Sequence, residues 1–384
     1  MNKLHTDNKK PAGIYIHIPF CKTRCTYCDF YTLTNESRID AFVENLCKEI
    51  QLRKDVIHEP VKTIYFGGGT PSRLSEQHFE SIFDNLFSNF NIDNTAEITV
   101  EANPDDLSAE YIQMLSRLPV NRLSIGIQSF DDDELKFLSR RHTANQAINA
   151  VKRCQMHGFN NISIDLMYGL PEQTTAIWEK NLKQATSLDI QHLSAYHLIY
   201  EEKTRMYSML KAGKIQPVDE EVSTAMFSML IDWMKQHNFI HYEISAFAKE
   251  GYFSGHNTSY WKGNKYIGLG PAAHSFDGEN RSWNVASLNA YIKGIEAGEP
   301  ERSSEHLSLN ERYNEFILTG LRTMWGIDLT ELKLIFGDKL YSYCIENADK
   351  YISKDLLSLE GNNMKLTRKG IFISDGIMSD LMSV

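Results

Sequence analysis

The stretch GIYIHIPFCKTRCTYC, residues 13–28, joins a short apolar segment to three closely spaced cysteines. Its first six residues, three of them isoleucine, are typical of a short strand that ends at Pro19-Phe20. The cysteine loop therefore follows the carboxyl end of this strand.

The loop holds Cys21, Cys25 and Cys28 in a C-x₃-C-x₂-C spacing, close enough for three thiolates to converge on one face of an iron–sulfur cluster. A [4Fe–4S] cube usually takes four cysteines, and residues 29–31 are Asp, Phe and Tyr, so no fourth thiol follows. The spacing favours a cube with one iron open to an exogenous ligand. A zinc site with a distant fourth ligand and unliganded core cysteines are the alternatives.

The composition describes an ordinary globular protein of 384 residues, 42% of them hydrophobic and 23% charged, long enough for two units. Its longest apolar runs fall short of the ~20 residues that span a membrane. The polar leader, residues 1–12, lacks the apolar region of a signal peptide, so we expect a cytoplasmic protein. The formal charge of −10 argues against nucleic acid as a partner.

Strand and helix patterns alternate from residue 13 to about residue 199. The predicted strands are 13–18, 63–66, 97–102, 122–128, 162–167 and 193–199, with helices between them at 37–56, from 75, from 108, 132–157 and 175–188. About six such units predict an α/β fold with parallel strands under a helical layer. Because the count is below eight, we expect an open, partial (β/α)6 TIM-like barrel.

The carboxyl ends of the predicted strands carry glycine or polar residues, and active sites of such barrels lie at these ends. The residues concerned are Cys21 onward, Gly67 to Thr70, Glu101, Gln128 and Asp165. Together they indicate one shared site. Taken singly, each has another interpretation: a tight turn for the glycines, a solvated acid for Glu101, and a buried pair or surface charge for Gln128, Arg140 and Asp165.

The pattern changes after about residue 200. A helix is expected at 219–237, a strand at 241–248 and an irregular loop at 263–276. The polar segment 296–306 contains Gly and Pro and is predicted to be a linker between a domain at 13–295 and a small unit at 307–384. That unit is mainly helical with a hairpin at 356–367, hence winged-helix-like. Its acidic residues outnumber its basic ones, which favours packing or partner binding over nucleic acid.

Residues 15–21 (YIHIPFC), with the cysteine spacing and the GGGTP turn at 67–71, resemble the radical S-adenosylmethionine (SAM) superfamily. The stretches EANP, GIQSF, SRRH and IDLMYGLP extend the resemblance to its coproporphyrinogen-oxidase-like branch. The resemblance implies a [4Fe–4S] cluster on the three cysteines, with SAM on the open iron and an electron donor such as flavodoxin or ferredoxin. The implied SAM contacts are Tyr15, Gly68, Gly69, Thr70, Glu101, Gln128, Arg140 and Asp165.

Two families of this branch compete. Oxygen-independent coproporphyrinogen III oxidases, which decarboxylate propionates, have another cysteine where this chain has Phe30, and a longer segment than the fourteen residues before Tyr15. The HemW-type haem chaperones have an H-N-x-x-Y-W signature, present here as His256, Asn257, Tyr260 and Trp261. The resemblance therefore favours the chaperones and implies haem at this signature.

Histidine can ligate haem iron, and Tyr and Trp can pack on a porphyrin. A histidine bonded within a loop beside two packed aromatics is the alternative, and His241 and His274 are further candidates for the iron ligand. We expect a chain that carries haem to acceptor proteins, with membrane-associated respiratory proteins among the candidates, as a monomer or dimer. A coproporphyrinogen oxidase is the alternative function. A tRNA-modifying radical enzyme is disfavoured by the acidic composition.

Overall fold

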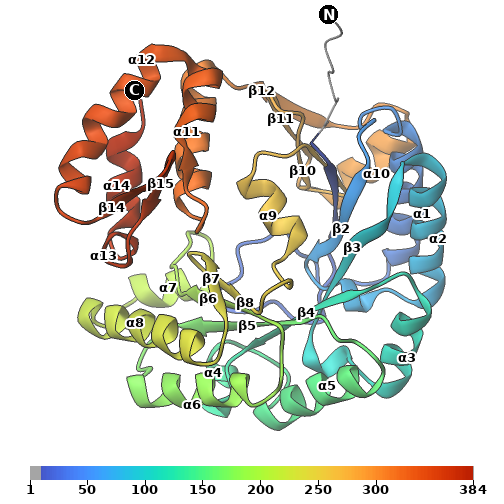
Figure 1. Ribbon diagram of the computed structural model, residues 1–384. Helices are drawn as coiled ribbons and strands as arrows, with labels where there is room; N and C mark the ends of the chain where they lie inside the picture. Colours follow the sequence, from blue (N-terminus) through green and yellow to red (C-terminus); the bar gives the residue numbers. More distant parts are fainter. Residues whose placement is uncertain (1–9, 384) are drawn as a thin grey trace, which may run out of the picture.

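The computed structural model describes residues 10–383. Six parallel strands follow one another in sequence order and form the curved centre of a larger sheet (Figure 1). They are β1 (Ala12–Ile18), β2 (Val61–Gly68), β3 (Ile92–Ala102), β4 (Arg122–Gln128), β5 (Ile162–Tyr168) and β6 (His192–His197). The predicted partial (β/α)6 barrel is therefore confirmed.

Helices on the outside of the curved sheet connect these strands (Figure 1). They are α1 (Ile39–Leu52), α2 (Glu76–Asn89), α3 (Ala109–Arg117), α4 (Asp132–Phe137), α5 (Ala144–Met156) and α6 (Thr175–Thr186). Side-chain caps begin several of them: Ser75 and Thr143 form capping boxes, and Ser108 accepts a hydrogen bond from the Tyr111 backbone. These caps explain why the predicted helix starts were close to the observed ones.

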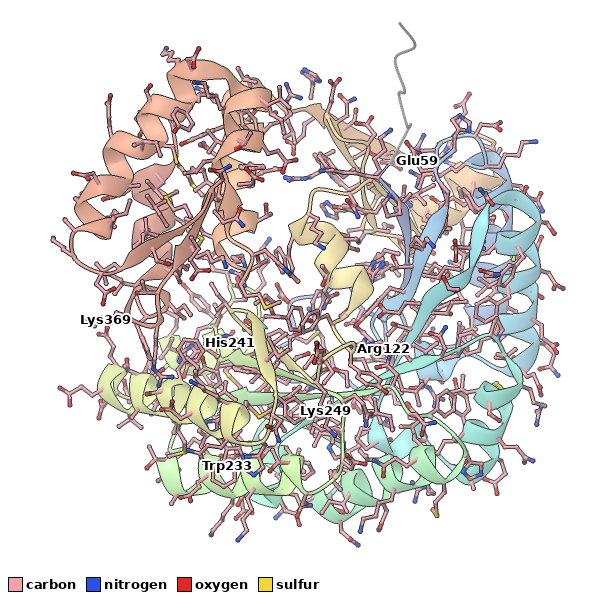
Figure 2. All side chains as sticks on the ribbon, viewed as in Figure 1. Glu59, Arg122, Trp233, His241, Lys249 and Lys369 are labelled. Carbon is pink, nitrogen blue, oxygen red and sulfur yellow. The ribbon has the colours of Figure 1, made fainter. Side chains whose placement is uncertain are left out.

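The two faces of the six strands differ in polarity. On β1 the alternate residues Ile14, Ile16 and Ile18 are fully buried in the main core with residues of the outer helices. Successive side chains of a strand point to opposite faces, so the residues between them face the inside of the arc. Figure 2 shows Arg122 at this inner side, near the centre of the molecule. Closed TIM barrels fill that space with branched apolar side chains, whereas this chain lines it with polar ones. The inward-facing residues include Tyr15, Thr63, Tyr65, Glu97, Glu101, Arg122, Ser124, Asp165 and Ser194.

The sheet extends beyond the six strands at both ends to a total of twelve among the described residues. On one side are β9 (Tyr266–Leu269), parallel to β1, and then β10 (His274–Phe276), β11 (Asn280–Asn284) and β12 (Arg302–His306). On the other side β8 (Ala246–Ala248) and β7 (Ile240–Glu243) follow β6. The segment 241–248 is thus part of a hairpin rather than a single strand.

The prediction of an irregular loop at 263–276 is wrong, because this segment contains the whole of β9 and of β10. A β-carbon on Gly268 would lie 2.0 Å from the backbone oxygen of His274, so only glycine permits this close approach. Helix α10 (Leu288–Glu296) ends where the predicted linker begins. The second half of the linker segment forms β12, an edge strand exposed along its whole length, so its sequence lacks an apolar alternation.

Helix α9 (Gly255–Trp261) lies inside the arc of strands and contacts β1 and β2 (Figure 1). It begins at Ser254, whose hydroxyl accepts a hydrogen bond from the Asn257 backbone. Two further helices, α7 (Arg205–Lys211) and α8 (Glu220–Gln236), follow β6. Within residues 10–383, none of the helices combines the length and the apolar character needed to cross a membrane.

The C-terminal unit has its own core and a three-stranded antiparallel sheet of order β13-β15-β14, as expected for a winged-helix-like shape. Two backbone hydrogen bonds tie it to β7: Met324 N–H donates to Tyr242 O at 3.0 Å, and Ile244 N–H to Arg322 O at 3.0 Å. Its elements are α11 (Leu309–Leu321), β13 (Ile327–Asp328), α12 (Leu329–Ile352), β14 (Leu357–Glu360), β15 (Asn363–Leu366), α13 (Arg368–Ile371) and α14 (Ser374–Leu381).

Candidate functional site

The cysteine loop leaves the carboxyl end of β1 and is held by backbone hydrogen bonds on both sides. Cys21 N–H donates to Leu33 O at 2.9 Å, and Thr26 N–H donates to Leu138 O at 3.2 Å. Cys21 is buried, and Cys25 and Cys28 are half-buried. The loop is therefore a fixed element of the structure, with its thiols turned toward the inside of the molecule.

Two side chains donate hydrogen bonds to the sulfur atoms. Thr70 Oγ1 lies 3.2 Å from Cys21 Sγ, and Arg140 Nη1 lies 3.3 Å from Cys25 Sγ. Burial raises the pKa of the Cys21 thiol, and it raises the pKa of Cys28 to about 11. The thiols of Cys21 and Cys28 are accordingly protonated at neutral pH until a positively charged partner displaces the protons.

The donor set fits an iron–sulfur cluster better than it fits a metal ion held by protein groups alone. Among residues 10–383, no group of three or more His, Cys, Asp or Glu side chains is close enough together to hold a metal ion. The remaining cysteines belong to other places, since Cys154 lies in the main core and Cys344 in the core of the C-terminal unit. No fourth thiol therefore completes a zinc site, whereas the fixed loop and the two donors to sulfur suit a cluster.

The glycine turn after β2 packs tightly against the end of β1. A β-carbon on Gly69 would lie 2.8 Å from Ile18 O, and one on Gly68, where φ is +103°, would lie 2.5 Å from the His17 ring. Gly69 N–H donates to Ile18 O at 2.8 Å. The turn therefore needs glycine for its own packing, and it places Thr70 against Cys21.

Two carboxylates, Glu101 on β3 and Asp165 on β5, face the interior beside this turn. Tyr65 Oη donates to Glu101 Oε1 at 2.7 Å. Burial raises the pKa of Glu101 to about 7 and that of Asp165 to about 6, and their mutual repulsion adds to the shift of Glu101. Glu101 is not a solvated acid. A pair of carboxylates in this state favours a ligand that brings positive charge and hydroxyl groups.

Strand β4 ends in a bulge that directs Gln128 into the same region. Its register with β5 shifts between Gly126 and Gln128, and Gln128 has a φ of +72°, an unusual value for a residue other than glycine. A β-carbon on Gly126 would lie 3.0 Å from Gln128 Nε2 and 3.4 Å from Arg140 Nη2. Arg140 also donates to Asn103 Oδ1 and to Gly126 O, and its Nε is buried without a partner among the described residues.

The structure thus brings the polar residues at the strand ends to one place, the predicted shared site. We call this group the carboxyl-end site, defined as the cysteine loop, the turn at 67–70, Glu101, Gln128, Arg140 and Asp165. Tyr15 lies below it on the inner face of β1, where its hydroxyl is 3.1 Å from His17 Nδ1 and its ring centroid is 6.2 Å from that of Tyr65. Phe30, beside the loop, is 60% exposed.

The H-N-x-x-Y-W signature is helical rather than a loop, because it forms α9. Residues four apart share a helix face, so His256 and Tyr260 lie on one face and Asn257 and Trp261 on the next. Trp261 packs under the guanidinium of Arg322, whose Cζ is 5.1 Å from the ring centroid. The second face therefore meets the C-terminal unit.

His256 is 1% exposed, and both of its ring nitrogens have partners. Nδ1 lies 2.9 Å from Thr63 Oγ1 and Nε2 lies 2.7 Å from Tyr260 Oη, both hydrogen-bond distances. The ring stacks on Tyr65 at 5.0 Å between centroids. Burial lowers the pKa of His256 to about 3, so the ring is neutral. Ligation of iron by this side chain would require one of these hydrogen bonds to break.

The start of α9 is held by a carboxylate that sequence reasoning missed. Glu97 accepts hydrogen bonds from the Gly255 and His256 backbones at 2.9 and 3.0 Å. Arg122, 2% exposed, lies 4.0 Å from Glu97. Both residues sit on the inner face of strands in which polar and apolar residues alternate, as in EITVEA at 97–102, a pattern that usually indicates one solvent-exposed face. The only sequence signal was the position of a charged residue within an otherwise apolar alternation. We call His256, Tyr260, Thr63, Glu97 and Arg122 the α9 cluster.

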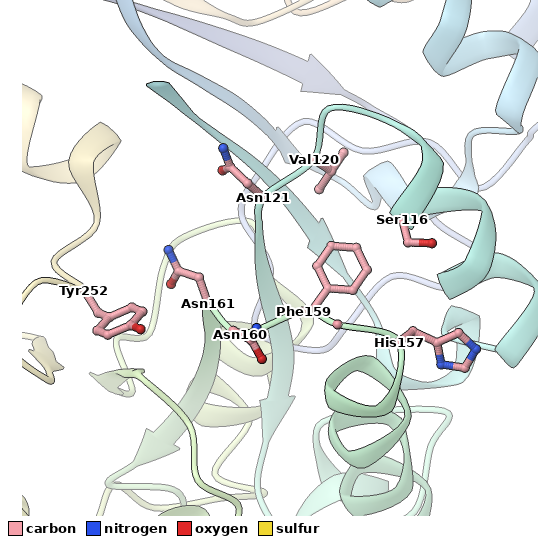
Figure 3. A pocket seen from close by; sticks show the side chains of 9 residues that line it. Ser116, Val120, Asn121, His157, Phe159, Asn160, Asn161 and Tyr252 are labelled. Atoms are coloured by element: carbon pink, nitrogen blue, oxygen red, sulfur yellow. The ribbon is translucent and has the colours of Figure 1, made fainter. Parts of the chain in front are cut away.

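Two pockets of the molecular surface lie away from the carboxyl-end site. One, of about 340 Å³, is lined by Asn121, Asn161, His157 and Tyr252, among others, at the amino ends of β4 and β5 (Figure 3). The other lies over α1 and α2, where Cys47 is one of its lining residues. Neither opens beside the cysteine loop.

Comparisons with known proteins agree with this geometry. Residues 15–185 match the model of the radical SAM superfamily, and residues 307–373 match the HemN C-terminal domain. The chain is 38% identical to the protein named heme chaperone HemW of Bacillus subtilis over 89% of this chain and 90% of that protein. It is 33% identical to the heme chaperone HemW of Lactococcus lactis over 97% and 98% of the two chains. The chain belongs to the HemW family.

Membership of the HemW family confirms the resemblance to the haem-chaperone branch of the radical SAM superfamily. The superfamily implies a [4Fe–4S] cluster and SAM. A solved structure of the coproporphyrinogen III oxidase HemN of Escherichia coli has a TM-score of 0.84 with this chain, at 20% identity, over 98% of this chain and 91% of that one. At that identity the likeness concerns the fold, so it does not assign the oxidase reaction to this HemW-family chain.

Proposed function

We propose that this chain is a haem chaperone that binds haem, holds a SAM-ligated [4Fe–4S] cluster and transfers haem to acceptor proteins. The observation that carries the proposal is the 38% identity to a protein named heme chaperone over almost the full length of both chains. The assembly of the carboxyl-end site in one place supports it. We propose the cytoplasm as its location, haem-accepting proteins as its partners, and no role for nucleic acid.

In this proposal the cluster is held by Cys21, Cys25 and Cys28. When bound, it supplies an electron to the SAM sulfonium, and a flavodoxin or ferredoxin is the proposed source of that electron. Thr70 and Arg140 donate hydrogen bonds to two of the cysteine sulfurs, at 3.2 and 3.3 Å, and so stabilise negative charge on them.

The proposed SAM contacts surround the same point from five strands. Glu101 and Asp165 would hold the positive charge and hydroxyls of SAM, because their raised pKa values fall when a cation approaches. Gln128 is placed by the bulge of β4, and Arg140 by its bonds to Asn103 and Gly126. The remaining contacts in the proposal are Tyr15, Gly68, Gly69 and Thr70.

The haem assignment of the α9 signature stays a prediction. As placed, His256 is closed to iron, and we assign to it and Tyr260 the task of supporting Tyr65, which donates to Glu101 at 2.7 Å. In this arrangement the signature would position Tyr65, and through it Glu101 of the proposed SAM site. The cluster and SAM would then control haem release or the choice between monomer and dimer.

Haem transfer tests the proposal. The protein, reconstituted anaerobically with iron, sulfide and SAM, is loaded with haem and mixed with a haem-depleted b-type acceptor, and the acceptor's spectrum is followed. We expect a saturable Soret band and recovery of the acceptor spectrum. In parallel, carbon dioxide release from coproporphyrinogen III with SAM and reductant is measured. Sustained release of carbon dioxide, with no haem binding, would favour the oxidase alternative and reject the chaperone.

A further inference from the structure

Strand β10, which lies beyond β9 on the β1 side of the sheet, carries an exposed imidazole on its inner face. His274 is exposed, and its ring nitrogens make no hydrogen bond with any residue between 10 and 383. Across the ladder of β10 and β11 it is paired with Trp283. The two rings stack with centroids 5.7 Å apart and planes 21° apart. Stacking fixes the plane of the imidazole while its nitrogens remain free.

The direction in which His274 points follows from its neighbours on β10. Ser275 is buried on the other side of the strand, where its hydroxyl accepts a hydrogen bond from Arg53, the residue directly after α1, at 3.0 Å. Successive side chains alternate, so His274 and Phe276 face away from α1, into the arc. Phe276 lies 6.3 Å from Tyr266, and Tyr266 lies 4.6 Å from Tyr260, between ring centroids. His274 therefore stands at the open end of an aromatic wall.

The turn that carries His274 is held in an unusual conformation. Ala272, two residues earlier, has a φ of +62°, and Gly270 has a φ of +94°. A β-carbon on Gly270 would lie 2.5 Å from His17 O, so the turn is pressed against the end of β1. A non-glycine residue at positive φ is strained and persists only where the surroundings impose it.

The surroundings here are a buried ion pair. Arg53 Nη1 lies 3.2 Å from Glu49 Oε1, and these side chains are 4% and 0% exposed. Glu49 accepts hydrogen bonds from Gly270 N–H and Asn284 Nδ2, both at 2.8 Å, and Arg53 donates to Gly268 O at 2.6 Å. The pair therefore clamps the turn before His274 and the end of β11 after Trp283. Buried charges are costly, and fixing one register is their best-attested use.

The other two histidines near the α9 signature in sequence are closed. His256 has both nitrogens engaged, as described above. His241 Nε2 lies 3.1 Å from Ile244 O, and its ring stacks on Phe247 at 4.3 Å between centroids. Of the three histidines that the sequence singled out as iron ligands, only His274 offers a free nitrogen on an accessible surface. Burial lowers its pKa, which keeps the imidazole in the neutral form that binds iron.

We propose that His274 is the side chain that ligates the haem iron, with Trp283 fixing the plane of its imidazole. This proposal rests on the proposed function, since it names the iron ligand of the same cargo. It moves the haem iron from the buried face of α9 to the exposed inner face of β10. The aromatic wall formed by Phe276 and Tyr266 then offers an apolar surface next to the iron site.

Spectroscopic titration of the full-length protein with ferric haem tests this assignment. The Soret band, the ferric EPR spectrum and the dissociation constant are recorded for the wild type, His274→Ala and His274→Gln. His306→Ala is the control, because His306 is an exposed histidine of the same sheet on β12, which is separated from β10 by β11. We expect both His274 variants to bind haem at least tenfold more weakly and to lose the histidine-ligated EPR signal. Millimolar imidazole should restore that signal, and the control should behave as the wild type.

Each outcome decides something. If the wild type binds no haem saturably, the proposed function fails. If the wild type binds haem and both His274 variants keep its spectrum and affinity, the chaperone stands and the assignment of His274 is overturned. Loss of the signal in His256→Gln but not in His274→Gln would also overturn it. Circular dichroism of each variant separates loss of the ligand from loss of the fold, and rescue by imidazole requires a folded site.

Discussion

The carboxyl-end site and the α9 cluster lie at different heights on the inner face of the same sheet, and they differ in how far their polar groups are satisfied. At the carboxyl end, Glu101 and Asp165 have raised pKa values, Gln128 is strained and Arg140 Nε lacks a partner among the described residues. In the α9 cluster, Arg122 Nε likewise lacks a partner among the described residues, but His256 uses both ring nitrogens and Glu97 accepts two backbone bonds.

This difference distinguishes a site that binds a ligand from a cluster that stabilises the fold. A site awaiting a ligand retains unsatisfied or strained groups, and a structural cluster uses its polar groups internally. Glu97 and Glu101 are four residues apart on β3, about 13 Å along the strand. Tyr65 lies between the two regions, stacked on His256 and bonded to Glu101. A motif residue can therefore serve a site that it does not touch.

The largest expected effect concerns the cysteine loop. Changing Cys21, Cys25 and Cys28 together to alanine should abolish iron and sulfide binding after anaerobic reconstitution, because the variant loses all three proposed ligands and residues 10–383 contain no preformed group of three His, Cys, Asp or Glu side chains that could replace them. The measurement is iron and sulfide content per chain, with Cys47→Ala as the control. A triple variant that kept its full iron content, or a wild type that held zinc instead, would contradict the assignment.

The second-largest expected effect concerns the stability that the α9 cluster gives to the fold. Glu97→Ala removes the acceptor of two α9 backbone bonds and leaves Arg122 buried without its acidic neighbour. We expect the free energy of unfolding to fall by about 2–4 kcal/mol. Denaturant unfolding of the variant against Glu80→Ala, an exposed acid on α2, gives the difference. A loss of less than about 0.5 kcal/mol would mean that α9 does not depend on this carboxylate.

Sequence reasoning succeeded where the signal was local and repeated. The partial barrel could be predicted from the apolar strands and the capped helices. The polar residues at the strand ends predicted that the members of the carboxyl-end site lie together. It failed where the structure depends on a long-range approach. No local pattern indicates that the segment around Gly268 forms a strand, β9, beside β1. Nor does any local pattern indicate that the signature at 256–261 forms a helix whose first residue, Gly255, donates a backbone hydrogen bond to Glu97, 158 residues away in sequence.

The inner polarity of the barrel was also missed, for a related reason. Glu97 and Arg122 occur in strands whose polar and apolar residues alternate, and the burial of the polar face becomes visible only when the register of neighbouring strands is known. Isolated charges in such strands have two local interpretations, an edge position or an interior pair. Only the curvature of the sheet decides between them, because it turns one face of every strand inward.

The smallest expected effect concerns the pH dependence of SAM binding, which tests whether the raised pKa values in the carboxyl-end site serve ligand binding. Burial raises the pKa of Glu101 from its ordinary 4.5 to about 7, and that of Asp165 from 3.8 to about 6. At pH 5.5 both are largely protonated in the SAM-free protein, whereas at pH 7.5 they are ionised. Because SAM carries positive charge on its amine and sulfonium, its affinity should rise about tenfold between these pH values.

Titration of the reconstituted protein with SAM at the two pH values measures this rise. Glu101→Gln should flatten it, and Glu179→Gln, an exposed acid on α6, should not. The same raised pKa has the opposite effect on the SAM-free protein. Between about pH 4.5 and 7 the unfolded chain releases the Glu101 proton before the folded protein does, so stability falls as the pH rises. If SAM affinity were constant over this range while stability fell, the raised pKa of Glu101 would belong to the fold alone, and the carboxyl-end site would resemble the α9 cluster.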